Sequence, residues 1–74
     1  MPYIAIKAYP KDEEIKKTVA KEISDVFLKH WGCPMEAISV SFEEVKPEDW
    51  ADVENKEIKP HEEKMYILSG EIKK

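Results

Sequence analysis

Two short stretches of the chain alternate between apolar and polar residues. In residues 3–9 (YIAIKAY) every second position is apolar on one side: Ile4, Ile6 and Ala8. In residues 38–45 (ISVSFEEV) the corresponding positions are Ile38, Val40 and Phe42. Strand side chains point alternately to opposite faces of a sheet, so a period of two is typical of a strand with one face in a core. The pattern therefore predicts two strands.

A helical period separates the two strands. Pro10 ends the first strand, and Asp12 is placed to cap a helix whose first turn carries Glu13 and Glu14, where the helix dipole favours acids. Gly32 supplies a left-handed stop. Apolar residues fall at helical spacing: Ile15, Val19, Ile23, Val26 and Phe27. These features predict an amphipathic helix over residues 13–31.

Strand, helix and strand in this order predict a βαβ unit with parallel strands and a right-handed crossover. After the second strand, Pro47 can begin a short helical turn, and Ile58-Lys59-Pro60 is expected to break any helix begun there. Pro60 itself resembles the start of a new helix, and Ser69-Gly70 marks a turn. The expected fold class is α/β: a single domain over residues 1–74, made of one βαβ unit with short C-terminal helical segments.

One face of this small sheet has nothing predicted to cover it. That face carries the following residues, which are too small and too weakly charged for a fully solvated surface: Tyr3, Ala5, Ser39 and Ser41. Parallel sheets are normally covered on both faces, and a core within 74 residues supplies little stability. Because the single Cys33 cannot form an intramolecular disulfide, we expect association of two copies to complete the sheet. A homodimer with two-fold symmetry is the simplest closed arrangement.

The charge balance excludes some classes of partner. The net charge is −4, from 16 acidic and 12 basic residues, and every base is a lysine. An acidic chain without arginine is not expected to bind nucleic acid. No apolar run approaches the roughly 18 residues of a membrane span, and no signal peptide is visible, so we expect a cytoplasmic protein without membrane contact. Cys33 is the single cysteine, and His30 and His61 are far apart in sequence, which is not a metal-binding pattern.

Pro2 is an unusual residue to precede a strand. Proline has no backbone N–H and fixes φ near −65°, so it pairs poorly in a sheet. One interpretation is a harmless edge residue that follows a retained Met1. The other is that Met1 is removed and that the nitrogen of Pro2 becomes a free secondary amine with a chemical role.

The whole chain supports the second interpretation through a resemblance. The segments MPYIAIKAYP, KEISDVFLKHWG, ISVSFEEVKPEDW and EIKPHEEKM resemble the 4-oxalocrotonate tautomerase family. Members of that family are small βαβ enzymes whose amino-terminal proline, exposed by methionine removal, acts as the catalytic base. The extended tail is most similar to a dimeric bacterial subgroup that is associated with phenylpyruvate-like enols.

The resemblance implies roles for four residues. Pro2 is the expected general acid and base. Lys11 and Ser39 fall close to positions where the hexameric members hold a dicarboxylate with arginines, and Trp50 falls where they have an aromatic residue that helps to keep the pocket dry. The absence of arginine argues against a dicarboxylate substrate. A monoanionic enol or keto acid is expected instead, with Lys11 as a point charge.

This chemistry places a demand on the proline amine. A proton shuttle works best with a pKa near the working pH, whereas a secondary amine is ordinarily too basic. Tyr3, Trp50 and the partner subunit could supply an apolar wall, and Lys7 and Lys11 could supply positive charge; both lower the pKa of an amine. We therefore expect an enol–keto tautomerase, without metal or cofactor, that acts as a homodimer. The alternative is a non-catalytic dimerising βαβ module with a structural Pro2 or a retained Met1.

Overall fold

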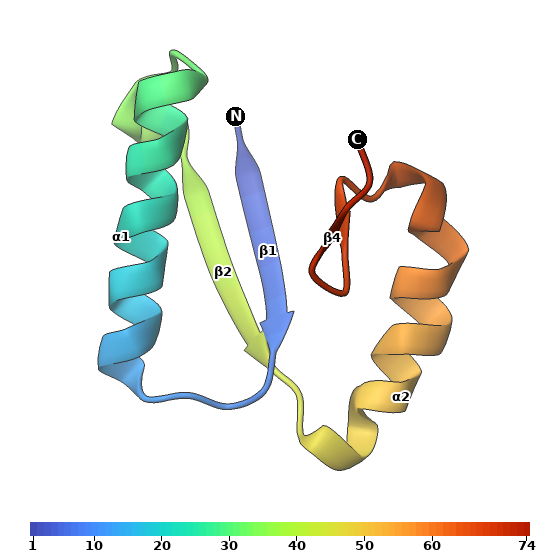
Figure 1. Cartoon of the computed structure of the whole chain (residues 1–74). Helices are drawn as coiled ribbons and strands as arrows, with labels where there is room; N and C mark the ends of the chain where they lie inside the picture. The colour runs from blue at the N-terminus through green and yellow to red at the C-terminus, as the bar shows by residue number, and fades with distance from the viewer.

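The computed structural model describes all residues, 1–74, and contains the expected βαβ unit (Figure 1). Strand β1 (Tyr3–Ala8) leads into helix α1 (Glu13–His30), and a short 3₁₀ turn (Met35–Ala37) precedes strand β2 (Ser39–Glu44). The two strands are parallel and in register from Tyr3 opposite Ser39 to Ala8 opposite Glu44. The α/β class and the parallel βαβ topology are thereby confirmed.

Helix α1 begins at the predicted residue, but the predicted side-chain cap is wrong. Asp12 occupies the N-cap position and its carbonyl accepts the N–H of Lys16 at 3.2 Å, yet its carboxylate makes no capping hydrogen bond. The helix ends at His30, and the following Trp31 N–H donates to the carbonyl of Phe27 at 2.9 Å. Gly32 then takes φ +74°, a left-handed conformation that favours glycine and turns the chain towards β2.

Only part of the apolar side of α1 packs against the rest of the chain. The least exposed positions of the helix are Lys16, Ala20, Ile23, Ser24 and Phe27. The other half of the stripe remains open to solvent: Ile15 is 46%, Val19 37% and Val26 56% exposed. The helix is therefore rotated so that one flank of its apolar side packs in the chain while the other flank has no partner there.

The tail differs from its predicted arrangement. A 3₁₀ turn (Pro47–Asp49) runs into α2 (Trp50–Val53), a wider π-helical turn (Glu54–Ile58) and a further 3₁₀ segment (Lys59–Lys64). The predicted break falls slightly later than expected: the backbone leaves helical geometry at His61 (φ −121°, ψ 23°), directly after Pro60, and Pro60 lies at the start of the last 3₁₀ segment. Proline cannot donate to a carbonyl in the preceding turn and its ring crowds that turn, so the change of helix type around Pro60 accommodates it. A hairpin of β3 (Ile67–Leu68) and β4 (Glu71–Ile72) follows, joined by the predicted turn at Ser69-Gly70.

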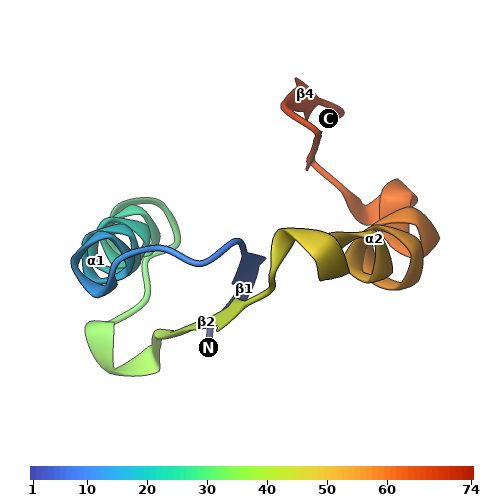
Figure 2. The same ribbon diagram turned by 90° about the horizontal axis from the view of Figure 1, so that it is seen from below.

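The elements form an open assembly. Figures 1 and 2 show α1 on one side of the β1–β2 sheet and the helical turns of the tail on the other, with the hairpin projecting away. The radius of gyration is 13.8 Å, against about 11 Å for a compact chain of this length. The exposed surface is 6015 Å², about 1,300 Å² more than a compact monomer of this mass exposes. No helix has the length and apolar character needed to cross a membrane.

Two residues of the chain are buried, and none is completely inaccessible to solvent. Val53 of α2, 7% exposed, and Ser24 of α1, 3% exposed, are the two residues that qualify as buried. The Ser24 hydroxyl donates to the carbonyl of Lys21 at 2.7 Å, so its polar atom is satisfied. Val53 is the one buried apolar anchor between the tail and the sheet.

Substitution of Val53 by alanine is expected to destabilise the protein by about 1–2 kcal/mol, because two buried methyl-sized groups are lost at about 0.8 kcal/mol each. Urea unfolding followed by circular dichroism measures the change. The matched control is Lys56→Ala in the same tail, whose exposed side chain is expected to contribute less than about 0.5 kcal/mol. Equal losses in both variants would contradict a tail anchored by Val53.

Candidate functional site

Pro2 and Ser39 lie together at the amino ends of the two strands. The carbonyl of Pro2 accepts the N–H of Ser39 at 3.1 Å, and the proline is half-buried. The ammonium group of Met1 donates to the carbonyl of Ala37 at 2.7 Å. With Met1 in place the nitrogen of Pro2 is an amide and has no basicity. The positive end of the chain is therefore directed at the turn that leads into β2.

Trp50 and Lys11 lie towards the carboxyl ends of the strands. The Trp50 ring meets the Tyr9 ring edge-to-face, with centroids 5.2 Å apart and an interplanar angle of 83°. This aromatic pair joins the end of β1 to the start of α2. Lys11 is in the connection between β1 and α1, and its ammonium group takes part in none of the six ion pairs of the chain.

A cavity of about 400 Å³ separates the second face of the sheet from the tail. Its walls include Tyr3, Ala5 and Lys7 of β1 together with Trp50, Val53 and Ile58 of the tail. This face was predicted to be covered by a second copy of the chain, whereas the tail lies over part of it. Tyr3 and Trp50, both expected to form an apolar wall, line the same cavity.

An ion pair closes one side of this cavity. The ammonium of Lys7 donates to the carboxylate of Glu57, which links β1 to the π-helical turn 50 residues later. The hydrogen bond with Glu57 raises the pKa of Lys7 above its ordinary value, with a smaller contribution from the charge of Glu43. The charge of Lys7 is therefore matched by acids of its own chain.

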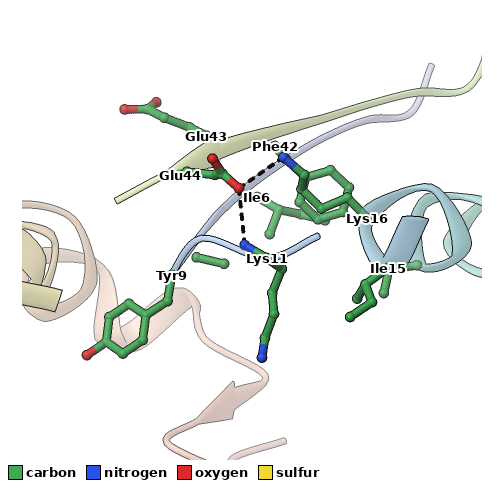
Figure 3. Close-up of a pocket in the computed structure, with 10 residues that line it drawn as sticks. Ile6, Tyr9, Lys11, Ile15, Lys16, Phe42, Glu43 and Glu44 are labelled. Atoms are coloured by element: carbon green, nitrogen blue, oxygen red, sulfur yellow. Dashed lines mark hydrogen bonds and ion pairs between the residues drawn. The ribbon is translucent and has the colours of Figure 1, made fainter. Parts of the chain in front are cut away.

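A second cavity, of about 240 Å³, lies between the carboxyl ends of the strands and the first turns of α1. Its floor is apolar and includes Ile6, Phe42 and Ile15, and its rim carries charged groups (Figure 3). Glu44 stands between two nitrogen donors there: one carboxylate oxygen accepts the backbone N–H of Lys11 at 3.1 Å and the ammonium of Lys16 at 3.0 Å.

The charges at this rim reinforce one another. The hydrogen bond from Lys16, followed by that from the Lys11 N–H, holds the pKa of Glu44 below its ordinary value. The hydrogen bond to Glu44 in turn raises the pKa of Lys16, and Glu13, 3.3 Å from the same ammonium, adds to the effect. Glu44 therefore stays ionised at neutral pH and ties the end of β2 to the loop before α1.

The four residues predicted for the site form two groups. Pro2 and Ser39 lie at one end of the sheet, and Lys11 and Trp50 at the other. The six-residue strand β1 between them spans about 20 Å. One chain alone therefore does not bring the proline together with the lysine and the tryptophan.

Tyr9 and Glu44 line the cavity of about 240 Å³, and neither was predicted from the sequence as a site residue. A parallel register places Glu44 opposite Ala8, beside the loop that carries Lys11, and this signal was available once two parallel strands were predicted. The contact of Tyr9 with Trp50 depends on the path of the tail, which no local pattern fixes. No cluster of three or more His, Cys, Asp or Glu side chains suitable for a metal ion occurs.

Comparison with known proteins gives a consistent result. The family model "Tautomerase enzyme" matches residues 2–54. The chain is 44% identical over 64 residues to Tautomerase PptA of Pectobacterium atrosepticum, which covers 82% of this chain and 84% of the relative. It is 36% identical over 72 residues to Tautomerase PptA of Escherichia coli O127:H6, which covers 95% of this chain and 96% of the relative. The family match spans the β1–α1–β2 unit and the start of the tail, and the two relatives cover most of the chain.

Proposed function

The chain belongs to the tautomerase enzyme family, and we propose that it is an enol–keto tautomerase that uses the amine of Pro2 as general acid and base. The observation that carries this proposal is the extent of the family match, which begins at residue 2, the proline itself. The relatives named tautomerases align over most of the chain, tail included, and support the same activity.

The proposed reaction moves one proton and needs no external reactant. The neutral amine of Pro2 takes the proton from the enol hydroxyl, the carbonyl forms, and the resulting ammonium returns a proton to the adjacent carbon. Oxygen loses one hydrogen and carbon gains one, so the balance closes without metal or cofactor. The amine must be largely neutral at the working pH, which requires surroundings that disfavour its ammonium form.

The proposed substrate is a small monoanionic 2-keto acid or its enol. Lys11 has an unpaired ammonium group that can attract one carboxylate. The chain has no arginine that could bind the carboxylates of a dicarboxylate through bidentate hydrogen bonds. The apolar walls formed by Trp50 and its neighbours suit a hydrophobic substituent such as a phenyl group.

The proposed assembly is a homodimer. The open flank of α1, consisting of Ile15, Val19 and Val26, is an apolar helix surface without a partner in the chain. The surplus exposed surface of about 1,300 Å² exceeds the roughly 800 Å² that each partner contributes to a standard interface. A second copy can cover this surface through a two-fold axis.

A two-fold axis perpendicular to the strands joins the two separated groups of residues. Such an axis places the strands of the two protomers antiparallel, so the amino ends of the strands of one protomer lie beside the carboxyl ends of the strands of the other. Pro2 and Ser39 of one protomer then approach Lys11 and Trp50 of its partner. In this proposal each active site is shared between protomers, which accounts for the 20 Å separation within one chain.

Activity is expected only in protein whose Met1 has been removed, because an acylated Pro2 nitrogen cannot carry a proton. Intact-mass spectrometry sorts preparations into processed and unprocessed chains, and ultraviolet absorbance follows the decay of phenylpyruvate enol. Processed protein is expected to accelerate ketonisation, and unprocessed protein is expected to match the buffer rate. Equal activity in both preparations would reject the proline amine. Inactivity of processed protein would favour a non-catalytic module.

A further inference from the structure

Glu44 occupies a position from which it controls the loop that carries Lys11. Its carboxylate accepts the backbone N–H of Lys11 at 3.1 Å and the ammonium of Lys16 at 3.0 Å. Figure 3 shows these two contacts as dashed lines, with the Lys11 side chain running away from the carboxylate. Glu44 therefore contacts the Lys11 backbone and leaves its ammonium group free.

The acidic side chains at this rim pair with Lys16 and not with the ammonium group of Lys11. Lys16, with its side chain 20% exposed, lies between Glu44 and Glu13 and is the cation that both acids bind. Without Lys16, the carboxylate of Glu44 would be an unpaired acid a few ångströms from the Lys11 backbone and a competitor for its ammonium. The pair of Lys16 and Glu44 thus fixes the loop through charge-assisted hydrogen bonds and leaves the Lys11 ammonium without an acid partner.

We infer that Glu44 is a positioning residue for anion binding, which holds Lys11 so that its ammonium can receive the carboxylate of a keto acid. This inference rests on the proposed function of Lys11 as the substrate's charge partner. Lys11 and Lys16 bind the same oxygen of Glu44, so in this inference Glu44 acts on the substrate through Lys11 and not by direct contact. Its removal should weaken binding of charged substrates and leave the proton transfer at Pro2 unchanged.

The test compares Glu44→Ala, Glu44→Gln and Lys11→Ala with the processed parent protein. Lys11→Ala is expected to raise the KM for phenylpyruvate enol about fivefold to tenfold, because a solvated charge contact at about 4 Å is worth about 1 kcal/mol in water. Glu44→Ala is expected to raise KM about threefold to tenfold with kcat within twofold, because binding common to ground and transition state is lost. Glu44→Gln keeps an oxygen for the Lys11 N–H and should recover part of the loss.

Two controls separate positioning from a general structural effect. The methyl ester of phenylpyruvate enol has no carboxylate, so its KM should stay within twofold in every variant. Glu13→Gln removes the other acid from Lys16 and leaves the contact between Glu44 and Lys11, so it should behave like the parent. Adding Glu44→Ala to Lys11→Ala should change KM no further, since both act through the same ammonium.

The inference is overturned if Glu44→Ala leaves the KM for the acid unchanged, raises the KM of acid and ester equally, or adds fully to Lys11→Ala. If the processed parent tautomerises neither compound, the proposed function fails, and binding alone then decides the inference. In that case, phenylpyruvate is titrated into parent and Glu44→Ala protein and the Lys11 amide is followed by NMR. A severalfold larger dissociation constant in the variant supports the positioning role of Glu44, and an equal dissociation constant rejects it.

Discussion

Replacement of Pro2 by alanine is expected to lower the kcat for enol ketonisation by about 100-fold or more, the range typical of a lost general acid–base group. The variant chain still begins with a free amine once Met1 is removed. That amine is primary and belongs to a residue that lacks the pyrrolidine ring, so it is held less firmly in the position that proton transfer requires. Stopped-flow absorbance with phenylpyruvate enol measures the rate.

The matched control for this variant is Pro47→Ala. This control makes the same substitution at a different proline. Pro47 begins the first turn of the tail, after β2. Its rate is expected to stay within about twofold of the parent. Intact mass and circular dichroism of both variants establish that Met1 is absent and that the fold is retained. A Pro2→Ala enzyme with parental kcat would exclude this residue as the proton shuttle.

Mixed dimers of Pro2→Ala and Lys11→Ala are expected to be more active at low substrate concentration than either variant alone. If each site takes Pro2 from one protomer and Lys11 from the other, a mixed dimer contains one site with both residues intact and one with neither. Random exchange makes about half of the dimers mixed, so kcat/KM per chain should return to about a quarter of the parental value. The assay is made before and after the two proteins are unfolded and refolded together.

The same experiment distinguishes a shared site from one within a single chain. In a single-chain site every protomer of the mixture keeps its own defect, and the activity stays at the mean of the two variants. Sedimentation analysis of the mixture confirms that dimers are present in the sample assayed. If the unmutated protein sediments as a monomer and is fully active in that state, both the dimer and the shared site are rejected.

The local elements followed from the sequence because their signals are short-range. The alternation in residues 3–9 and 38–45 sets which side chains share a strand face, and the spacing over residues 13–30 sets a helix, independently of what packs on them. The helical connection between them is long enough for the crossover that parallel strands need, and it therefore favours parallel pairing. The family resemblance could also be recognised from the sequence, since it lies in contiguous segments.

The tail was harder to predict because its helix type depends on more than local propensity. Pro60 is a strong signal for a break, and the helical run is interrupted at His61, one residue later. The packing of Val53 and the ion pair of Lys7 with Glu57 hold the turns that precede this kink. The cap by Asp12 failed for a related reason. The nearby loop is instead fixed by Glu44, which is 33 residues beyond Lys11.

The sequence by itself determined two parallel strands, the crossover helix, the candidate proline and the lack of an arginine clamp, because each depends on residue type or on spacing within about 20 positions. Only the tertiary structure decided which flank of α1 stays open, that the tail lies over the second sheet face, and that Pro2 and Lys11 stand at opposite ends of β1. Those features arise from the rotation of a helix about its axis and from contacts between residues 30 to 50 positions apart, which are set when surfaces pack and not by any periodicity along the chain.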